Sequence, residues 1–323
     1  MGTKRVLIVD ALNAYLRAYI VDPSVSTNGQ PIGGLKGFIK ILQKLVRQTK
    51  PNVLAICWDG PNGSKKRKTM DKNYKEGRKP IRLNRSVHNL TDDEELQNKI
   101  WQQGRVVEYI NNMPIIQTML PEIEADDVIS YVKSSTMFKD WQKVIVSADK
   151  DFIQLLDNKT LLFRPIQKEV LSLKTVVEKF GIHPRNFALA RAMAGDPSDN
   201  LPGVPRVGLG TVAKRFSFLS SDKDFFLEDI MKESKSSKNK KLKVYQNIVD
   251  CEKIIKENYD IMQLSSPQMS IQSKNKIDDI FEGYRPHYNQ TEMRKLMIQD
   301  GVLTVNMQNL EQKFNDIITS FSN

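Results

Sequence analysis

The residues of this sequence that are best suited to chemistry are nine carboxylates, which fall into five short groups. They are Asp10, Asp59, Glu124, Asp126, Asp127, Asp149, Asp151, Asp196 and Asp199. Carboxylates brought close together repel one another by roughly 4 kcal/mol per pair at an effective dielectric constant of about 20, so such a cluster takes up protons or holds cations. Oxygen ligands in a partly hydrated cage favour magnesium or manganese over zinc. The pattern therefore predicts a divalent-metal site, provided that the fold brings the groups together.

The densest group, residues 122–127, also has a simpler interpretation. Acidic residues in the first turn of a helix are stabilised by the helix dipole, and helical spacing puts Glu124 and Asp127 on one face. A well-capped helix would explain this group equally well if it stood alone. The other groups favour an acidic cluster, because two apolar runs elsewhere in the chain end at Asp10 and Asp59.

The elements expected to position these groups are short buried strands. Residues 3–10 and 53–58 are apolar runs, and residues 34–50 between them repeat apolar positions at helical spacing. A strand, a helix and a second strand predict parallel pairing with a right-handed crossover, and ligands gather at the carboxyl ends of such strands. Asp10 and Asp59 both stand at these ends.

Further strands are expected at 115–120 and 143–149, followed by a hairpin at 160–173. An acidic first turn after Thr91 predicts a helix to about residue 112. We therefore predict an α/β fold with a parallel-stranded central sheet and helices on both of its faces.

The predicted organisation has two parts. Residues 1–183 form an α/β catalytic domain with a basic arch at 62–112, and residues 184–323 form a helical region with a helical tail. Two short helices joined by a glycine-bearing hairpin, at about 186–219, suit non-specific phosphate binding. The stretch 232–243 has six lysines and no apolar periodicity, which predicts a mobile loop.

The net charge of +11 and the pI near 9.4 indicate a polyanionic partner. Residues 62–85 carry ten Lys and Arg against two acids, directly after Asp59 at a strand end. A charge run of this kind is often only a solvated surface. Its position above the acidic cluster favours nucleic-acid binding, so the residues together predict a metal-dependent phosphodiesterase.

Other chemistries are disfavoured by composition. The two cysteines give neither a disulfide framework nor zinc spacing, and the three histidines are isolated from one another. A Ser/His/Asp nucleophile is a weak candidate for the same reason. With no apolar run of about eighteen residues and no charged leader, we expect a soluble, cytoplasmic protein without a membrane span.

In order along the chain, the carboxylate groups resemble the 5′ nuclease (flap endonuclease) family over about residues 4–220. The size and the helical tail resemble the ribonuclease H branch of T-even bacteriophages. The resemblance implies a PIN-like core and two Mg²⁺ or Mn²⁺ ions. It assigns the first metal to Asp10, Asp59, Glu124, Asp126 and Asp127, and the second to Asp149, Asp151, Asp196 and Asp199.

The resemblance also implies nucleic-acid contacts. Tyr74-Lys75-Glu-Gly-Arg78 is similar to the family's Tyr-Lys-x-x-Arg, in which Lys75 and Arg78 would be catalytic and Tyr74 would stack on a base. Further contacts are expected from Asn13, Arg17, Lys65, Lys66, Arg67, Lys68, Arg82, Gly203, Arg206, Gly208, Gly210 and Lys214. The family hairpin holds a monovalent cation, but here Arg206 stands where a glycine is usual and Gly210 where a lysine is common.

The implied function is hydrolysis at the 5′ ends of duplexes, RNA primers and 5′ flaps during DNA replication or repair. The expected partners are duplex DNA with a flap, nick or primer, and replication proteins such as a single-strand-binding protein or a sliding clamp. One alternative is a non-catalytic module that binds branched DNA, which would have no need of nine acids. Another is a PIN-type single-strand ribonuclease, which would explain neither the basic arch nor the hairpin.

Overall fold

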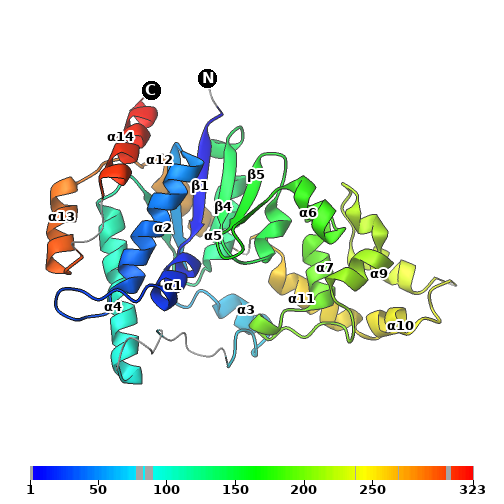
Figure 1. Ribbon diagram of the computed structural model, residues 1–323. Coiled ribbons are helices and arrows are strands. Elements are labelled where there is room, and N and C mark those ends of the chain that lie inside the picture. Colours follow the sequence, from blue (N-terminus) through cyan, green and yellow to red (C-terminus); the bar gives the residue numbers. More distant parts are fainter. Residues whose placement is uncertain are drawn as a thin grey trace.

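A six-stranded sheet forms the centre of the molecule (Figure 1). The computed structural model describes residues 3–77, 83, 90–236, 238–267, 269–302 and 307–322. The strands are β1 (Arg5–Asp10), β2 (Val53–Trp58), β3 (Ile116–Met119), β4 (Gln142–Val146), β5 (Thr160–Arg164) and β6 (Glu169–Leu171). Their order in the sheet is β3-β2-β1-β4-β5-β6, and only β6 is antiparallel to its neighbour. The predicted α/β fold class is confirmed.

The strand order places the acidic groups at one edge of the sheet. β1 lies between β2 and β4, parallel to both. The order of strands therefore changes direction beside β1, with β2 and β3 on one side and β4, β5 and β6 on the other. The carboxyl ends of parallel strands at such a switch point form a crevice in α/β proteins. Asp10, Asp59 and Asp149 stand at the carboxyl ends of β1, β2 and β4 or directly after them.

Helices cover both faces of the sheet, as the apolar strands require. One face packs on α1 (Ala11–Val21), α2 (Gly33–Thr49) and α4 (Asp92–Asn111), and the other on α5 (Ala125–Ser134) and α7 (Phe187–Ala194). The start of α4 is fixed by a capping box between Thr91 and Glu94.

The remaining elements form a helical arm and a tail. The helices are α3 (Lys65–Met70), α6 (Leu173–Phe180), α8 (Leu209–Arg215), α9 (Leu227–Ser234), α10 (Lys243–Asp250), α11 (Glu252–Met262), α12 (Ile271–Glu282), α13 (Gln290–Gln299) and α14 (Gln308–Ser322). Short 3-10 turns are η1 (Thr136–Phe138), η2 (Asp151–Leu155), η3 (Pro184–Asn186), η4 (Pro197–Asp199) and η5 (Ser217–Ser220). Among the described helices, none is long and apolar enough to cross a membrane.

The helical tail packs back on the α/β core. α12 returns to β3 and α5, and α14 packs against α2 (Figure 1). Asp300 accepts a hydrogen bond from Arg105 Nε at 2.8 Å and another from the Tyr109 hydroxyl at 3.0 Å, which fastens the end of α13 to α4. The core that supports the acidic edge therefore includes residues from both ends of the chain.

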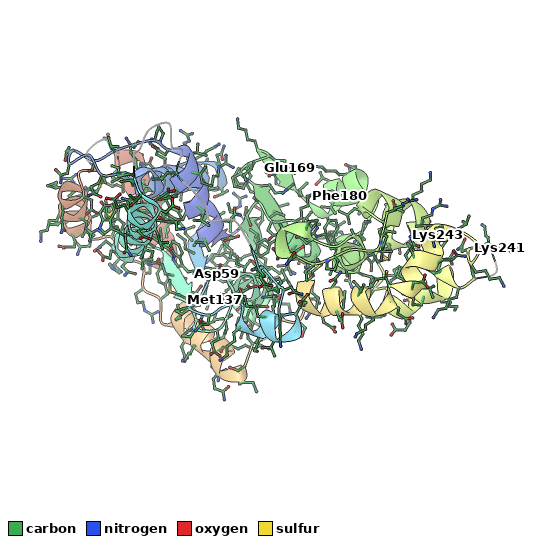
Figure 2. All side chains as sticks on the ribbon, turned by 90° about the horizontal axis from the view of Figure 1, so that it is seen from below. Asp59, Met137, Glu169, Phe180, Lys241 and Lys243 are labelled. Carbon is green, nitrogen blue, oxygen red and sulfur yellow. The ribbon has the colours of Figure 1, made fainter. Side chains whose placement is uncertain are left out.

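The lysine-rich stretch 232–243 is more ordered than predicted. α9 continues to Ser234, and turns follow in the described residues. The buried side chain of Asn239 donates to the carbonyl of Glu233 at 3.1 Å, which fixes the base of the turn. In Figure 2 this end of the arm, with Lys241 and Lys243, lies far from Asp59, which stands near the junction of arm and sheet.

Candidate active site

Asp10 begins the site by joining two strand ends. Its carboxylate accepts a hydrogen bond from the backbone N–H of Asn13 at 3.1 Å and thereby caps α1. It also accepts from the hydroxyl of Ser147 at 2.8 Å, just after β4. The Asn13 side-chain oxygen in turn accepts from the N–H of Ala148 at 3.2 Å. Local capping thus aligns the ends of β1 and β4.

The other strand ends are joined in the same way. Asp59, after β2, accepts a hydrogen bond from the N–H of Ala125 at 2.7 Å and so fixes the start of α5 beside it. After β4, Asp149 donates its N–H to the hydroxyl of Ser147 at 3.1 Å, and its carboxylate accepts from the N–H of Asp151 at 2.8 Å. Three strand ends are therefore held by short polar contacts.

These groups share one cavity of about 550 Å³. Five of the predicted metal ligands line it, together with three predicted substrate-binding residues. They are Asp10, Asp59, Asp126, Asp149 and Asp199, with Asn13, Arg17 and Lys75. A second cavity of about 690 Å³ borders Asp59 and Glu124 on the side of Lys65 and Lys68. The structure thus brings five of nine predicted carboxylates into one hollow.

The carboxylates of this hollow are held in conditions that disfavour negative charge. Burial raises the pKa of Asp10 to about 7, and the charges of Asp59 and Asp149 add to the effect. Burial and then Asp149 raise the pKa of Asp126 well above its usual range, and burial raises that of Asp149. A positive ion bound among these groups would be strongly favoured.

Asp151 and Asp196 instead share a cation of the protein, Arg191 of α7. Arg191 Nε donates to Asp151 at 2.9 Å, and another guanidinium nitrogen pairs with Asp196. Burial and Asp149 still raise the pKa of Asp151 to about 7. For Asp196 burial acts in the same direction, but hydrogen bonds from Ser198 and the charge of Arg191 outweigh it and lower the pKa.

Sequence reasoning missed Arg191. The only signal was one charged residue in the otherwise apolar helix Phe187–Ala194, about one turn before Asp196. A lone charge inside an apolar helix is seldom buried without a partner, and the partner here is carboxylate.

Glu124 and Asp127 are also paired with protein cations. Arg67 of α3 contacts both carboxylates, with 2.9 Å between its guanidinium and Asp127, and its Nε donates to the carbonyl of Ile261 at 3.0 Å. Burial opposes the charge of Glu124, but Lys75 and Arg67 outweigh it and lower the pKa to about 2. In this structure the Arg67 guanidinium is buried and engaged by these carboxylates, and its contact with nucleic acid stays a prediction.

Tyr74 is buried as well, in a small cluster with Leu201, Ile261 and Met262. Its hydroxyl lies 3.4 Å from Glu124. The ring packs in this cluster and is not open to a base, and stacking by Tyr74 stays a prediction. Arg67 and Tyr74 fasten the described part of the basic segment, residues 62–77, to the arm.

Lys75 lies between Glu124 and the acidic hollow, and its catalytic role stays a prediction. Its Nζ is 2.7 Å from Glu124 Oε1, and its side chain lines the acidic hollow. Its N–H donates to the carbonyl of Asp199 at 3.0 Å. Burial opposes its charge, but Glu124 and Asp126 raise its pKa, so it stays a cation. Arg78 and Arg82 fall outside the described residues.

The hairpin lies beside Asp196, one of the acids that the resemblance assigns to the second metal. Gly195 has φ +74, and a Cβ there would stand 2.3 Å from the backbone nitrogen of Gly203, so the turn before Asp196 requires glycine. Arg206 adopts φ +65 where the family usually has glycine, so the turn keeps its left-handed conformation. Gly208 precedes α8, which carries Gly210 and Lys214. Lys65 pairs with Glu122 at the surface, and Lys66 and Lys68 lie beside it on α3.

Residues 5–181 match the family model of the 5′-3′ exonuclease N-terminal resolvase-like domain, which is more than half of the chain. The chain belongs to the 5′-3′ exonuclease family. The 5′-3′ exonuclease of Aquifex aeolicus is 29% identical over 206 residues, 64% of this chain and 66% of that protein. The 5′-3′ exonuclease of Buchnera aphidicola subsp. Schizaphis graminum is 31% identical over 222 residues, 66% of this chain and 71% of that protein.

The chain spans only part of these relatives, and 25% of the DNA polymerase I of Caldicellulosiruptor bescii, to which it is 29% identical over 69% of its own length. A structure of bacteriophage T5 5′-exonuclease with bound zinc ions covers 92% of this chain and 98% of its own, with a TM-score of 0.65 and 16% identity. A T5 flap endonuclease complex with DNA and metal ions gives a TM-score of 0.64 at 15% identity, covering 99% and 100%. These two structures establish that the exonuclease-family fold extends over the whole chain.

The donors of this exonuclease-family site fit a hard divalent cation. Across the described ranges, no three His, Cys, Asp or Glu side chains are arranged closely enough to hold a metal ion together. The carboxylates around the hollow nevertheless offer oxygen ligands alone, and burial makes positive charge favourable there. Oxygen-only ligand sets suit hard divalent cations.

Proposed function

We propose that this chain is a structure-specific, divalent-metal-dependent 5′ nuclease that hydrolyses phosphodiesters at the 5′ ends of duplexes and 5′ flaps. The observation that carries the proposal is the hollow at the switch point of the sheet, with five buried or half-buried carboxylates and Lys75 in its wall. Family membership and the names of the relatives, which are 5′-3′ exonucleases, support the reaction class.

The charge partner of each acidic residue indicates its role. Asp10, Asp59, Asp126, Asp149 and Asp199 would hold Mg²⁺ or Mn²⁺, which when bound lowers the pKa of water and stabilises charge on the scissile phosphate. Glu124 and Asp127, which the resemblance assigned to the first metal, instead hold Lys75 and Arg67. Lys75 would turn from Glu124 to the phosphate and stabilise the developing charge, with Arg78 beside it.

Substrate binding would use the basic surface on either side of the hollow. Lys65, Lys66 and Lys68 on α3 would contact the 5′ strand, and Arg17 in the hollow would meet a phosphate. One nitrogen of Arg17 is buried without a hydrogen-bond partner among the described residues, so it gains from an anion. The hairpin around Gly203, Arg206, Gly208, Gly210 and Lys214 would hold the duplex and, as the family resemblance suggests, a monovalent cation.

The finer predictions rest on the resemblance. They are RNA-primer removal in replication, the T-even ribonuclease H branch, protein partners such as a single-strand-binding protein or a sliding clamp, and a cytoplasmic, monomeric state. They would be tested after the reaction itself has been measured.

The test uses 5′-labelled duplexes with a flap, a nick or an RNA primer, and free single-stranded RNA, each incubated with Mg²⁺ or with a chelator. We expect metal-dependent products from the branched and nicked duplexes. Binding without cleavage would favour the non-catalytic module. Preferential cleavage of single-stranded RNA would favour the PIN-type ribonuclease.

A further inference from the structure

Arg191 stands inside the acidic site as a cation that belongs to the protein. We propose that Arg191 supplies part of the positive charge at Asp151 and Asp196, so that the site binds one divalent ion tightly and a second one only weakly. This inference rests on the proposed function, since it concerns the metals of that same site.

The guanidinium is fully engaged. Arg191 Nε donates to Asp151 Oδ1 at 2.9 Å, a second nitrogen pairs with Asp196 Oδ2, and the third lies 3.3 Å from the carbonyl of Gly195. The side chain is 11% exposed, and the two carboxylates are 16% and 15% exposed. A charge-assisted network of this kind is favoured by the low exposure of all three side chains.

Three of the four carboxylate oxygens of Asp151 and Asp196 accept from donors of the protein. Asp196 Oδ1 accepts from the N–H and the hydroxyl of Ser198 at 2.9 and 2.7 Å, while Oδ2 faces Arg191. A divalent ion that used Asp151 and Asp196 would have to displace these donors or share oxygens with them. An arginine remains protonated at any ordinary pH, so it competes with the ion throughout.

The other half of the site has no such direct ion pair within the described residues. Asp10, Asp126 and Asp149 line the hollow, and Lys75, which lines it with them, is paired with Glu124. The hollow thus has two unequal places for positive charge. The first divalent ion meets Asp10, Asp126 and Asp149 without displacing an ion pair, whereas the second must compete with Arg191 for Asp151 and Asp196.

The experiment measures Mn²⁺ binding without nucleic acid, by calorimetry and by the electron paramagnetic resonance signal of free Mn²⁺. We compare the wild-type chain with Arg191→Met, which removes the charge at similar length, and Arg191→Lys, which keeps the charge but loses the forked geometry. Arg185→Met is the control, because Arg185 lies on the same arm and pairs only with exposed acids, Asp222 and Asp224. Thermal melts confirm that each variant is folded.

We expect the wild-type chain and Arg185→Met to bind one ion tightly and a second at least tenfold more weakly. Arg191→Met should tighten the second ion about tenfold or more, and Arg191→Lys should lie between. Equal second-ion affinity in the wild type, Arg191→Met and Arg191→Lys would overturn the inference and leave the proposed function intact. If the wild-type chain bound no Mn²⁺ at all, both would fail. Should Arg191→Met not fold, Arg191→Lys against the wild type decides the question.

Discussion

The acidic groups of this protein fall into two regions that treat charge differently. Around Asp10, Asp126 and Asp149, buried and half-buried carboxylates line one hollow, and their pKa values are raised. Around Glu124 and Asp127, the carboxylates are fully buried, but Lys75 and Arg67 neutralise them and lower the pKa of Glu124 to about 2. The first region keeps an excess of negative charge that would favour a bound cation, whereas the acids of the second region are neutralised by Arg67 and Lys75.

The difference teaches that acidic spacing alone does not identify a ligand. Glu124, Asp126 and Asp127 are nearly adjacent in sequence, yet only Asp126 lines the hollow with the strand-end acids. Asp127 points to Arg67, a residue 60 positions away. An acid is available to a metal ion only where no protein cation already pairs with it.

The largest effect should come from the region around Asp10, Asp126 and Asp149. Asp149→Asn removes a charge from the hollow without changing the shape of the side chain, so it should lower the single-turnover cleavage rate by about 10⁴-fold while leaving duplex binding within about twofold, because metal-ion stabilisation of the transition state is worth several kcal/mol. Rapid-quench measurements at saturating enzyme check the rate, and fluorescence anisotropy checks the binding. Near wild-type turnover would remove Asp149 from the metal site.

In the region around Glu124 and Asp127, a substitution of Arg67 should lower the stability of the protein. Arg67→Ala leaves Glu124 and Asp127 buried without their cation, and the loss of one partner of a buried ion pair destabilises proteins by about 3–5 kcal/mol. Urea denaturation of the metal-free protein measures the free energy of unfolding. Arg67→Lys should recover part of the loss, because it restores the charge but not the contacts with both carboxylates. An unchanged unfolding midpoint for Arg67→Ala would mean that this region is not held by the ion pair.

Lys75 connects the two regions, because it pairs with Glu124 and lines the hollow. If it turns to the phosphate in the transition state, Lys75→Ala should lower the single-turnover rate by about 10²–10³-fold with little change in substrate affinity. Lys72→Ala is the matched control, since Lys72 is an exposed lysine three residues earlier. Equal losses of affinity in both variants, with no loss of rate in the bound state, would reduce Lys75 to an electrostatic contact.

Much of this arrangement could be predicted from sequence, because it depends on residues that are close together in the chain. Apolar runs that end in aspartate predicted the parallel strands and the position of Asp10 and Asp59 at one edge. The roles of Arg67 and Arg191 could not be predicted, because one arginine among ten basic residues, or one in an apolar helix, does not reveal which distant carboxylate it meets. The return of α12 and α14 to the sheet was missed for a similar reason: an amphipathic pattern shows that a face is buried, but not against what.

The smallest effect separates the two regions by pH. Because the metal-free pKa of Asp10 is raised to about 7, a proton must leave before this group can bind an ion, so Mn²⁺ affinity should rise with pH from about 5.5 to 8, by at most about tenfold per pH unit for each proton released. The same shift makes the folded, metal-free state bind more protons than the unfolded chain, so the contribution of Asp10 to stability is lost as pH rises from about 4 towards 7. Glu124 has the opposite sign: its depressed pKa contributes stability above its usual pKa, which is lost as pH falls towards about 2. Calorimetry in buffers of different ionisation enthalpy counts the protons released on Mn²⁺ binding. A pH-independent affinity without proton release would contradict the distinction between the two regions, because it would mean that the strand-end acids are already ionised before the metal ion arrives.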